Sequence, residues 1–329
     1  MIISRTPLRV SFAGGGTDLP AFYTNQAGAV VSTAIAKYIY INLNRKFDRK
    51  VRASYSITEI VDDASQLKHE LIREALKLVG ISSGIEITSI SDIPSSGTGL
   101  GSSSTYTVGL LNALYAYTGR HVGPERLAQE ACMIEIEVCG KPIGKQDQYA
   151  AAYGGLEYIQ FNPDGTVFVD PIIMDPGTKG RLQDRLLMLY TGMTRSADGI
   201  LKEQSSNTAS EEAKRLVLGK MKKQADEMRV ALEQNCLDDF GSLLHEGWML
   251  KKSLANGITN PKIDEWYGIA RSHGAIGGKI LGAGGGGFLL LYAYPEQHPI
   301  LTSALHELIP TPFRLEPQGS KIIFVEESS

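Results

Sequence analysis

Apolar and polar residues alternate at the start of the chain. Across residues 6–13, Leu8, Val10 and Phe12 occupy every second position, which predicts a half-buried strand that runs into three consecutive glycines. Similar patterns predict further strands over residues 29–35, 38–47, 85–90 and 156–161. We therefore expect a curved antiparallel sheet in the first half of the chain.

Several other segments have helical periodicity. Residues 65–79 place their apolar residues on one face and end at Gly80, a typical helix C-cap residue. Residues 124–138 also predict a helix, with an apolar stripe of Leu127, Ala131, Ile134 and Val138. The remaining helices are predicted over residues 105–117, 210–234, 237–254, 261–273 and 299–308.

A turn-rich segment over residues 162–180 separates two halves of the chain. The second half opens with a buried strand at residues 186–190, and its last strands are predicted at residues 288–294 and 322–325. A length of 329 residues also indicates two domains, at about 150 residues per domain. We therefore predict one domain over residues 1–180 and a second over residues 181–329.

Composition and charge exclude several classes of protein. Hydrophobic residues at 43% and charged residues at 21% are typical of a folded globular chain. The 33 basic residues are spread along the sequence and the net charge is -3, which argues against binding to nucleic acid or to an anionic membrane. Cys132, Cys139 and Cys236 form no CxxC pair, so we expect reduced thiols in a cytoplasmic protein. The pattern predicts neither a secretion signal nor a membrane span.

Glycine is unusually frequent, and many of the 35 glycines are bunched at residues 14–16, 97–101 and 282–287. The segment Gly97-Thr-Gly-Leu-Gly-Ser-Ser-Ser104 offers backbone amides and three hydroxyls at a predicted helix start, which suits phosphate and magnesium binding. Helix capping by these serines is the alternative. Two standard nucleotide motifs do not fit, because Gly144-Lys145 lacks a Walker A context and a strand follows the last glycine cluster.

Three segments together resemble the signature motifs of the GHMP small-molecule kinases. They are, in order, Pro7-Leu-Arg-Val-Ser-Phe-Ala-Gly-Gly-Gly-Thr-Asp18, Pro94-Ser-Ser-Gly-Thr-Gly-Leu-Gly-Ser-Ser-Ser104 and Lys279-Ile-Leu-Gly-Ala-Gly-Gly-Gly-Gly-Phe288. This superfamily includes galactokinases, homoserine kinases, mevalonate kinases and phosphomevalonate kinases. The Gly-Gly-Gly-Thr-Asp-Leu-Pro20 form of the first motif is similar to that of D-glycero-D-manno-heptose 7-phosphate kinases, whereas galactokinases carry Gly-Glu-His-Thr-Asp.

The resemblance implies an α+β fold with two domains and a cleft between them. The N-terminal domain would be of the ribosomal protein S5 domain 2-like type, and the C-terminal domain a ferredoxin-like α/β sandwich. The family's cofactors are ATP and Mg²⁺. Ser103 is expected to ligate the metal. Many members have alanine where this chain has Ser104, so the Ser104 hydroxyl is an alternative metal ligand. The residues expected to bind ATP are Pro94, Gly97, Gly99, Leu100, Gly101, Ser102, Ser103 and Ser104.

Two residues are expected to carry the catalysis. The segment Gly144-Lys-Gln-Asp-Gln148 is similar to the family's Gly-x-x-Asp-Gln, whose aspartate accepts the proton of the substrate hydroxyl or holds that hydroxyl in place. The resemblance therefore implies this role for Asp147, which suits a reaction that depends on positioning and charge stabilisation. Arg9 stands where the family has a basic residue that stabilises the transferring phosphoryl group. A helix-capping aspartate and a solvent-facing arginine are the alternatives.

Glu135 lies twelve residues before Asp147, which matches the spacing of the magnesium-ligating glutamate in galactokinase-like members of the family. Glu137 is a rival only two positions away. On a helix the two side chains point about 200° apart, so only one of them can face the cleft. The apolar stripe of this helix places Glu135 nearer the buried side, and a solvated helix face is the alternative for either residue.

The resemblance also implies residues for the acceptor. Asp18 is similar to the aspartate that hydrogen-bonds sugar hydroxyls, and Thr17 is expected to assist it. Arg195 follows the first strand of the second half and is expected to bind the phosphate of a phosphorylated sugar. Gly284 to Gly287 are expected to let the third motif pack closely beneath the phosphate loop and the substrate, and Gly284 and Gly285 are expected to contact the substrate.

These features predict an ATP-dependent sugar kinase. The expected reaction is phosphorylation of the anomeric hydroxyl of D-glycero-D-manno-heptose 7-phosphate to the 1,7-bisphosphate, for the synthesis of nucleotide-activated heptose. Small molecules are the expected partners, and a homodimer is compatible with the sequence. The alternatives are another sugar-1-kinase, for galactose, fucose or an amino sugar, a non-catalytic ligand sensor on the same fold, and a nucleotide-dependent dehydrogenase.

Overall fold

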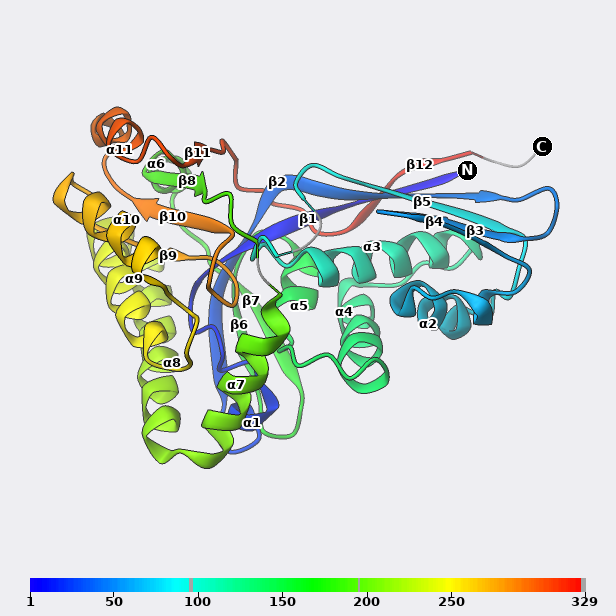
Figure 1. Cartoon of the computed structure of the whole chain (residues 1–329), viewed down its shortest axis with the longest axis horizontal. Coiled ribbons are helices and arrows are strands. Elements are labelled where there is room, and N and C mark those ends of the chain that lie inside the picture. Colours follow the sequence, from blue (N-terminus) through cyan, green and yellow to red (C-terminus); the bar gives the residue numbers. More distant parts are fainter. Residues whose placement is uncertain (95–96, 195, 327–329) are drawn as a thin grey trace.

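The computed structural model describes residues 1–94, 97–194 and 196–326. Its larger sheet has the strand order β12-β1-β2-β5-β3-β4, and β6 pairs with β2 and with β7 (Figure 1). The strands of this sheet are β1 (Ile2–Ala13), β2 (Gly28–Arg45), β3 (Val51–Ser54), β4 (Thr58–Val61), β5 (Ile85–Ser91), β6 (Leu156–Phe161), β7 (Val167–Pro171) and β12 (Lys321–Val325).

The strand β2 is one long curved element where the sequence predicts two. Its first residues, 28–33, pair with β6, and its last residues, 39–45, pair with β5. The pairing between β1 and β2 shifts register between Pro7 and Leu8, which bends both strands at this point. The expectation of a curved, mainly antiparallel sheet is confirmed, and only the β3–β5 pair is parallel among the pairings of the described residues.

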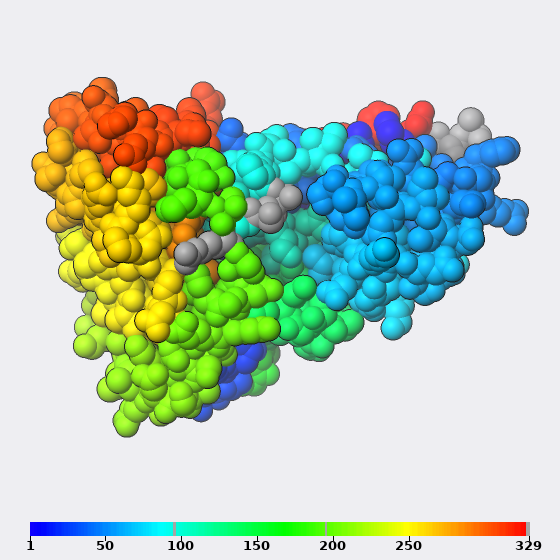
Figure 2. All heavy atoms as spheres, in the orientation of Figure 1, coloured from blue at the N-terminus to red at the C-terminus, as the bar shows by residue number. Residues whose placement is uncertain are grey.

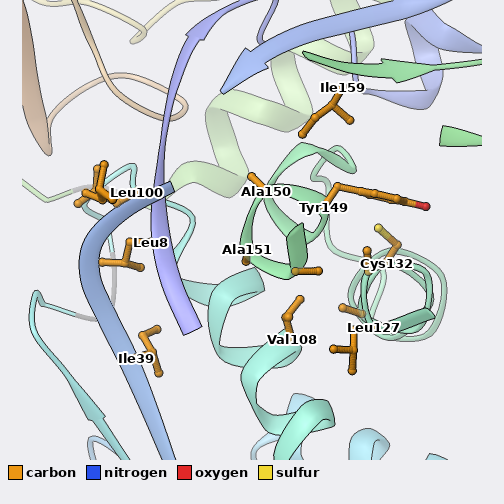
Figure 3. Packing of buried hydrophobic residues seen from close by; sticks show 14 of the residues in the cluster. Leu8, Ile39, Leu100, Val108, Leu127, Cys132, Tyr149, Ala150, Ala151 and Ile159 are labelled. Atoms are coloured by element: carbon orange, nitrogen blue, oxygen red, sulfur yellow. The ribbon is translucent and has the colours of Figure 1, made fainter. Parts of the chain in front are cut away.

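Helices cover one face of this sheet. They are α2 (Glu70–Val79), α3 (Ser102–Tyr117), α4 (Pro124–Cys132) and α5 (Gln146–Tyr153). The helix α3 packs on β1 and β2 and contacts each of the other three helices. Figure 3 shows Val108 of α3, Leu127 of α4 and Ala151 of α5 in one buried cluster, and Leu8 and Ile39 of the sheet belong to the same core. This packing fixes where α3 and α5 begin, and both begin at the site described below.

The helix α4 continues into a π-helical segment, Met133–Val138. A π-helix has more residues per turn than an α-helix, so side chains rotate away from the stripe that an α-helical pattern predicts. Val138 was expected on that apolar stripe, but its side chain is 52% exposed. The position of Val138 is therefore a correction to the sequence analysis.

The smaller sheet has four antiparallel strands in the order β11-β8-β10-β9. Its strands are β8 (Leu186–Tyr190), β9 (Gly277–Ile280), β10 (Phe288–Tyr292) and β11 (Ile309–Pro310). The helices of this half are α6 (Pro176–Asp184), α7 (Ala197–Ser210), α8 (Glu212–Glu233), α9 (Leu237–Lys252), α10 (Pro261–Ser272) and α11 (His298–Ala304), and α1 (Pro20–Tyr23) lies near α7. The predicted α+β fold class is confirmed.

The two halves meet through more than one connection. The closing strand β12 was expected with the second half, but it pairs with β1 and covers the outer edge of the larger sheet. The helices α8 and α9 also pack against β1 and β2. In Figure 2 the helices of the second half lie at one end of the molecule, and α2 and the β3–β4 hairpin lie at the other. The division at residue 180 stays a prediction.

No helix in the described part of the chain combines the length and the apolar character needed to cross a membrane. The prediction missed α1, β3, β4, β7, α6, α7, β9 and β11 as separate elements. The helix α7 matters most here, because it lines the cavity between the two halves.

Candidate active site

The three glycine clusters, which lie far apart in the sequence, line a single cavity of about 530 Å³. Residues from the start of α3, the start of α5, the helix α7 and the end of α9 complete its walls. The lining therefore includes residues of both sheets and of both halves of the chain. The predicted site residues in its lining are Arg9, Asp18, Gly97, Gly99, Gly101, Ser102, Ser103, Ser104, Asp147 and Gly284.

The second and third glycine clusters touch through their backbones. A Cβ atom added to Gly99 would lie 2.2 Å from the carbonyl oxygen of Leu281, and one added to Gly282 would lie 2.3 Å from the Cα atom of Gly99. The backbone at Gly99 has φ of 77°, which a side chain would also disfavour. Glycine is required at both positions, so the third motif packs directly beneath the phosphate loop.

The serines of the phosphate loop begin the helix α3. Its N-cap residue is Gly101, and none of the serine side chains caps the helix. The side chains of Ser102 and Ser104 are buried, whereas that of Ser103 is exposed toward the cavity. The helix start thus presents backbone N–H groups, and the Ser103 side chain lines the cavity beside them. Backbone N–H groups at a helix start are an arrangement that binds phosphate.

Two residues of the predicted phosphate loop lie outside the cavity lining. Leu100 is fully buried in the larger core, where its side chain anchors the loop. Pro94 is exposed at the end of the described segment before the loop. Their predicted contact with ATP stays a prediction.

Arg9 and Asp147 form a bidentate ion pair in the lining of the cavity. The Nε atom of Arg9 donates to Oδ1 of Asp147 at 2.8 Å, and Nη2 donates to Oδ2 at 2.8 Å. The third nitrogen, Nη1, donates to the carbonyl oxygen of Gly99 at 2.6 Å. Arg9 is only 4% exposed, so it does not point into solvent as the alternative supposed. Asp147 binds Arg9 and does not cap α5, which excludes the other alternative.

Glu135 lies beside the phosphate loop and is fully buried. Its Oε1 atom accepts a hydrogen bond from Ser103 Oγ at 2.7 Å, and Oε2 accepts one from Gln148 Nε2 at 2.7 Å. Burial raises the pKa of Glu135, and the hydrogen bonds from Ser103, Ser104 and Gln148 oppose that rise. Glu137 is exposed, so of the two rivals only Glu135 contacts Ser103.

The pair Ser103 and Glu135 fits a magnesium ion. Both side chains offer hard oxygen atoms, and Mg²⁺ in kinases is commonly held by one or two carboxylates together with substrate phosphates. No cluster of three or more His, Cys, Asp or Glu side chains occurs in the described residues. The remaining ligands would therefore have to come from ATP and water. The burial of the Glu135 carboxylate also favours a bound cation.

Asp18 lines the cavity at the end of the first glycine motif. Its Oδ1 atom accepts from the N–H of Gly16 at 2.9 Å, and Oδ2 accepts from Gln146 Nε2 at 3.1 Å. Burial raises the pKa of Asp18, because desolvation outweighs these hydrogen bonds. A Cβ atom on Gly144 would lie 1.9 Å from Asp18 Oδ2, so glycine is needed there to admit the carboxylate.

Thr17 contacts the protein backbone. Its hydroxyl donates to the carbonyl oxygen of Gly14 at 2.8 Å and accepts from the N–H of Ala29 at 3.0 Å. The residue is fully buried and does not line the cavity. The contacts of Thr17 hold the first glycine loop against β2, and its predicted help in substrate binding stays a prediction.

Of the substrate-binding residues predicted in the second half, only Gly284 is found in the cavity lining of the described chain. Gly284 lines the cavity, whereas Gly285 lies outside the lining and its N–H donates to the carbonyl oxygen of Ile258 at 2.9 Å. Arg195 lies outside the described residues. Its neighbours Thr194 and Ser196 both line the cavity.

Several buried side chains of the cavity were missed by the sequence analysis, among them Lys279, Gln204 and Lys251. Lys279 belongs to the third motif, and its Nζ atom donates to the carbonyl oxygens of Ser11 and Phe12 at 2.9 and 3.1 Å. Gln204 of α7 is 2% exposed, and its Nε2 atom has no partner among the described residues. Lys251 of α9 is 6% exposed.

A signal for Lys251 was present in the sequence. The buried face of α9 includes Leu237, Leu244 and Trp248, and Lys251 follows at the same helical spacing. A lysine on an apolar helix face must either pair with an acid or reach a polar site. No comparable pattern marks Gln204, because α7 was not predicted as a separate helix.

Comparison with known protein families identifies the architecture. The family model for the GHMP kinases N terminal domain matches residues 65–155, and the model for the GHMP kinases C terminal matches residues 228–307. A mevalonate kinase of Methanothermobacter thermautotrophicus is 30% identical over 68% of this chain and 69% of that protein. The chain belongs to the GHMP kinases. The predicted family is thereby confirmed, together with the predicted class of enzyme, an ATP-dependent phosphotransferase.

Other GHMP kinases match over more of the chain. The D-glycero-alpha-D-manno-heptose 7-phosphate kinase of Campylobacter jejuni is 29% identical, over 93% of each chain. The crystal structure of a D-glycero-D-manno-heptose 1-phosphate kinase from Bacteroides thetaiotaomicron superimposes with a TM-score of 0.81 at 25% identity, covering 99% of this chain and all of that one. An L-fucokinase/L-fucose-1-P guanylyltransferase of Bacteroides fragilis is 27% identical over 95% of this chain, which is 37% of that longer protein.

Proposed function

We propose that this GHMP kinase transfers the γ-phosphoryl group of ATP to the anomeric hydroxyl of D-glycero-D-manno-heptose 7-phosphate, which yields the 1,7-bisphosphate. The observation that carries the proposal is the Arg9–Asp147 ion pair, which lines the same cavity as the phosphate loop. Ser11, Asp18 and Gln204 also line this cavity, and we call these three side chains the acceptor wall. The similarity to the Campylobacter jejuni enzyme over 93% of each chain supports a heptose phosphate as the acceptor.

The acceptor wall suits a molecule with many hydroxyl groups. Asp18 offers a carboxylate, and Ser11 and Gln204 are buried and have polar atoms without partners among the described residues. Unpartnered buried polar groups are costly, so a ligand that supplies hydrogen bonds satisfies them. A sugar provides both donors and acceptors at the necessary density.

The residues of the chain divide the chemistry between them. Backbone N–H groups at the start of α3 bind the phosphates of ATP. Ser103 and Glu135 would hold Mg²⁺, which neutralises phosphate charge when bound. Asp147 receives the proton of the acceptor hydroxyl as that oxygen attacks, and Arg9 both orients Asp147 and stabilises the charge on the transferring group.

An ATP-consumption screen over free and phosphorylated sugars tests the proposal. The panel includes heptose 7-phosphate, heptose 1-phosphate, free heptose, galactose and fucose, because the names of the heptose relatives differ in the phosphate position. We expect heptose 7-phosphate to give the highest kcat/KM and a product phosphorylated at both ends. A higher kcat/KM for galactose or fucose would favour another sugar-1-kinase. Binding of sugar and ATP without turnover of any acceptor would favour the ligand sensor.

We also propose a cytoplasmic location, for which the three free cysteines, Cys132, Cys139 and Cys236, are the support. The homodimer compatible with the sequence stays a prediction. Sedimentation velocity at several protein concentrations measures the oligomeric state directly.

A further inference from the structure

Lys251 brings a positive charge to the lining of the cavity. It lies in the last turn of α9, and its Nζ atom donates to the carbonyl oxygen of Gly282 in the third glycine cluster. That is its one hydrogen bond among the described residues, and no carboxylate of those residues forms an ion pair with it. Asp147 is bound to Arg9, and Asp18 is bound to Gly16 and Gln146.

The buried ammonium group of Lys251 has fewer hydrogen-bond acceptors among the described residues than it has N–H donors. Lysine has three N–H donors, and Lys251 uses one of them on a protein acceptor. Burial of a cation costs free energy unless an anion or several oxygen atoms surround it. Because Lys251 lines the cavity, the two remaining donors are available to a ligand there. An anionic oxygen is the ligand atom that this site fits.

Lys251 lies close to two of the glycine clusters that line the cavity. A Cβ atom on Gly15 would lie 3.8 Å from Lys251 Nζ, so the ammonium group lies against the first glycine cluster. Its acceptor Gly282 packs against Gly99, whose carbonyl oxygen binds Arg9. Lys251 is thus connected to the Arg9–Asp147 pair through the backbones of Gly282 and Gly99.

We propose that Lys251 is a catalytic residue whose ammonium group donates hydrogen bonds to the phosphoryl group as it passes from ATP to the acceptor. In this step the bond between the γ-phosphorus atom and the bridging oxygen of ADP breaks. A bond forms between that phosphorus atom and the acceptor oxygen, whose proton passes to Asp147. Lys251 keeps its proton throughout. The inference rests on the proposed phosphoryl transfer and does not depend on which sugar is the acceptor.

The titration of Lys251 supplies a measurable signature. Burial and the positive charge of Arg9 lower the pKa of Lys251 to about 8, while Asp18 and Asp147 act in the opposite direction. Lys279 of β9 is close enough for the charge of Lys251 to affect it, and Lys141 and Asp198 also line the same cavity. The protonated form binds the phosphoryl group, so kcat/KM, which reports the enzyme without bound substrates, should fall as the pH rises through about 8.

Steady-state kinetics of Lys251→Met and Lys251→Arg test the proposal, with any acceptor that the wild-type enzyme phosphorylates. For Lys251→Met we expect kcat to fall about a hundredfold, the usual effect of removing one donor to a transition state, with little change in either KM. For Lys251→Arg we expect partial activity and loss of the fall in kcat/KM near pH 8, because arginine does not titrate there. Lys252→Met is the matched control, since Lys252 pairs with Asp264 and does not line the cavity.

A second measurement separates transition-state binding from folding. ADP with aluminium fluoride and the acceptor mimics the phosphoryl group in transfer, and we expect Lys251→Met to weaken this complex while its affinity for ADP alone is unchanged. Wild-type kcat in Lys251→Met would overturn the proposal. A rise only in the KM for a phosphorylated acceptor would also overturn it and would place Lys251 at the distal phosphate. If Lys251→Met does not fold, an unchanged alkaline limb in Lys251→Arg overturns the proposal.

Discussion

Two hydrogen bonds of 2.8 Å join Arg9 of β1 to Asp147 of α5, which lie 138 positions apart in the sequence. The planar guanidinium group and the carboxylate match in a fork-to-fork geometry that fixes the orientation of both. The third nitrogen of Arg9 holds the phosphate loop through Gly99. Arg9 thereby connects Asp147, the proposed acceptor of the hydroxyl proton, to the loop that is proposed to bind ATP.

Replacement of Asp147 tests its role in the transfer. We expect Asp147→Asn to lower kcat by about two orders of magnitude or more, because asparagine cannot accept the hydroxyl proton. The dissociation constants for ATP and for the sugar should change little, since the side chain keeps its size. Rapid-quench kinetics and calorimetry measure the two effects. Asp62→Asn, at an exposed ion pair with Lys50, is the control, and near-normal turnover of Asp147→Asn would remove Asp147 from the mechanism.

Glu135 and Glu137 provide a paired test of the metal site. We expect Glu135→Gln to raise the Mg²⁺ concentration needed for half-maximal activity, because it removes one hard anionic ligand. Ser103→Ala should act in the same direction, since it deletes the hydroxyl that contacts Glu135. Glu137→Gln is the matched control, because that side chain is exposed on the same π-helical segment. Titration of activity with Mg²⁺ gives the comparison, and an effect of Glu137→Gln alone would reverse the assignment.

Gln204 tests the proposed acceptor wall. Its Nε2 atom is buried beside Gly16 and lacks a partner among the described residues, so a substrate hydroxyl can accept from it. We expect Gln204→Leu to raise the KM for the acceptor by about three- to tenfold, the effect of one neutral hydrogen bond. The KM for ATP should not change. Lys202→Met, at an exposed position of the same helix, is the control, and equal effects on both substrates would argue for a structural role.

Arg195 tests the choice of a phosphorylated sugar. We expect Arg195→Ala to raise the KM for heptose 7-phosphate by roughly ten- to a hundredfold, the loss of a charged hydrogen bond, with little change in the KM for ATP. Kinetics with free heptose provide the control, since that substrate lacks the distal phosphate. If wild-type activity is the same on both sugars, neither the role of Arg195 nor the phosphorylated acceptor is supported.

Glu157 of β6 should make stability depend on pH. Burial and the nearby charge of Asp170 raise the pKa of Glu157 to about 7, against 4.5 for an ordinary glutamate, and its Oε2 atom has no partner among the described residues. The folded protein therefore binds a proton that the unfolded chain releases between these values, so stability falls as the pH rises from about 4.5 through 7.

Glu157→Gln removes this titration. We expect the variant to gain stability over the wild type at pH 8, by about 2 kcal/mol, and to match it near pH 4.5. Urea unfolding at several pH values measures the difference. The exposed Glu227→Gln is the control, and a difference that does not vary with pH would contradict the assignment.

The sequence alone was sufficient for the features that depend on local pattern. Alternation predicted β1, and the resemblance of three ordered motifs to those of the GHMP kinases predicted the family. The glycines of these motifs serve close backbone approach, since positions such as Gly99 and Gly282 tolerate no side chain. Helical periodicity also separated Glu135 from Glu137, since one of two side chains two positions apart must point away from the core.

Tertiary structure alone decided the features that join distant segments. The pairing of β12 with β1 depends on an open sheet edge that no local pattern reveals, and the π-helical turn at residues 133–138 moved Val138 to the surface. The contact of Lys251 with Gly282 exists because α9 packs beside β9 and the loop that follows it. Local sequence determines which residues a helix buries, but only packing determines whether a buried lysine meets a carboxylate or a cavity.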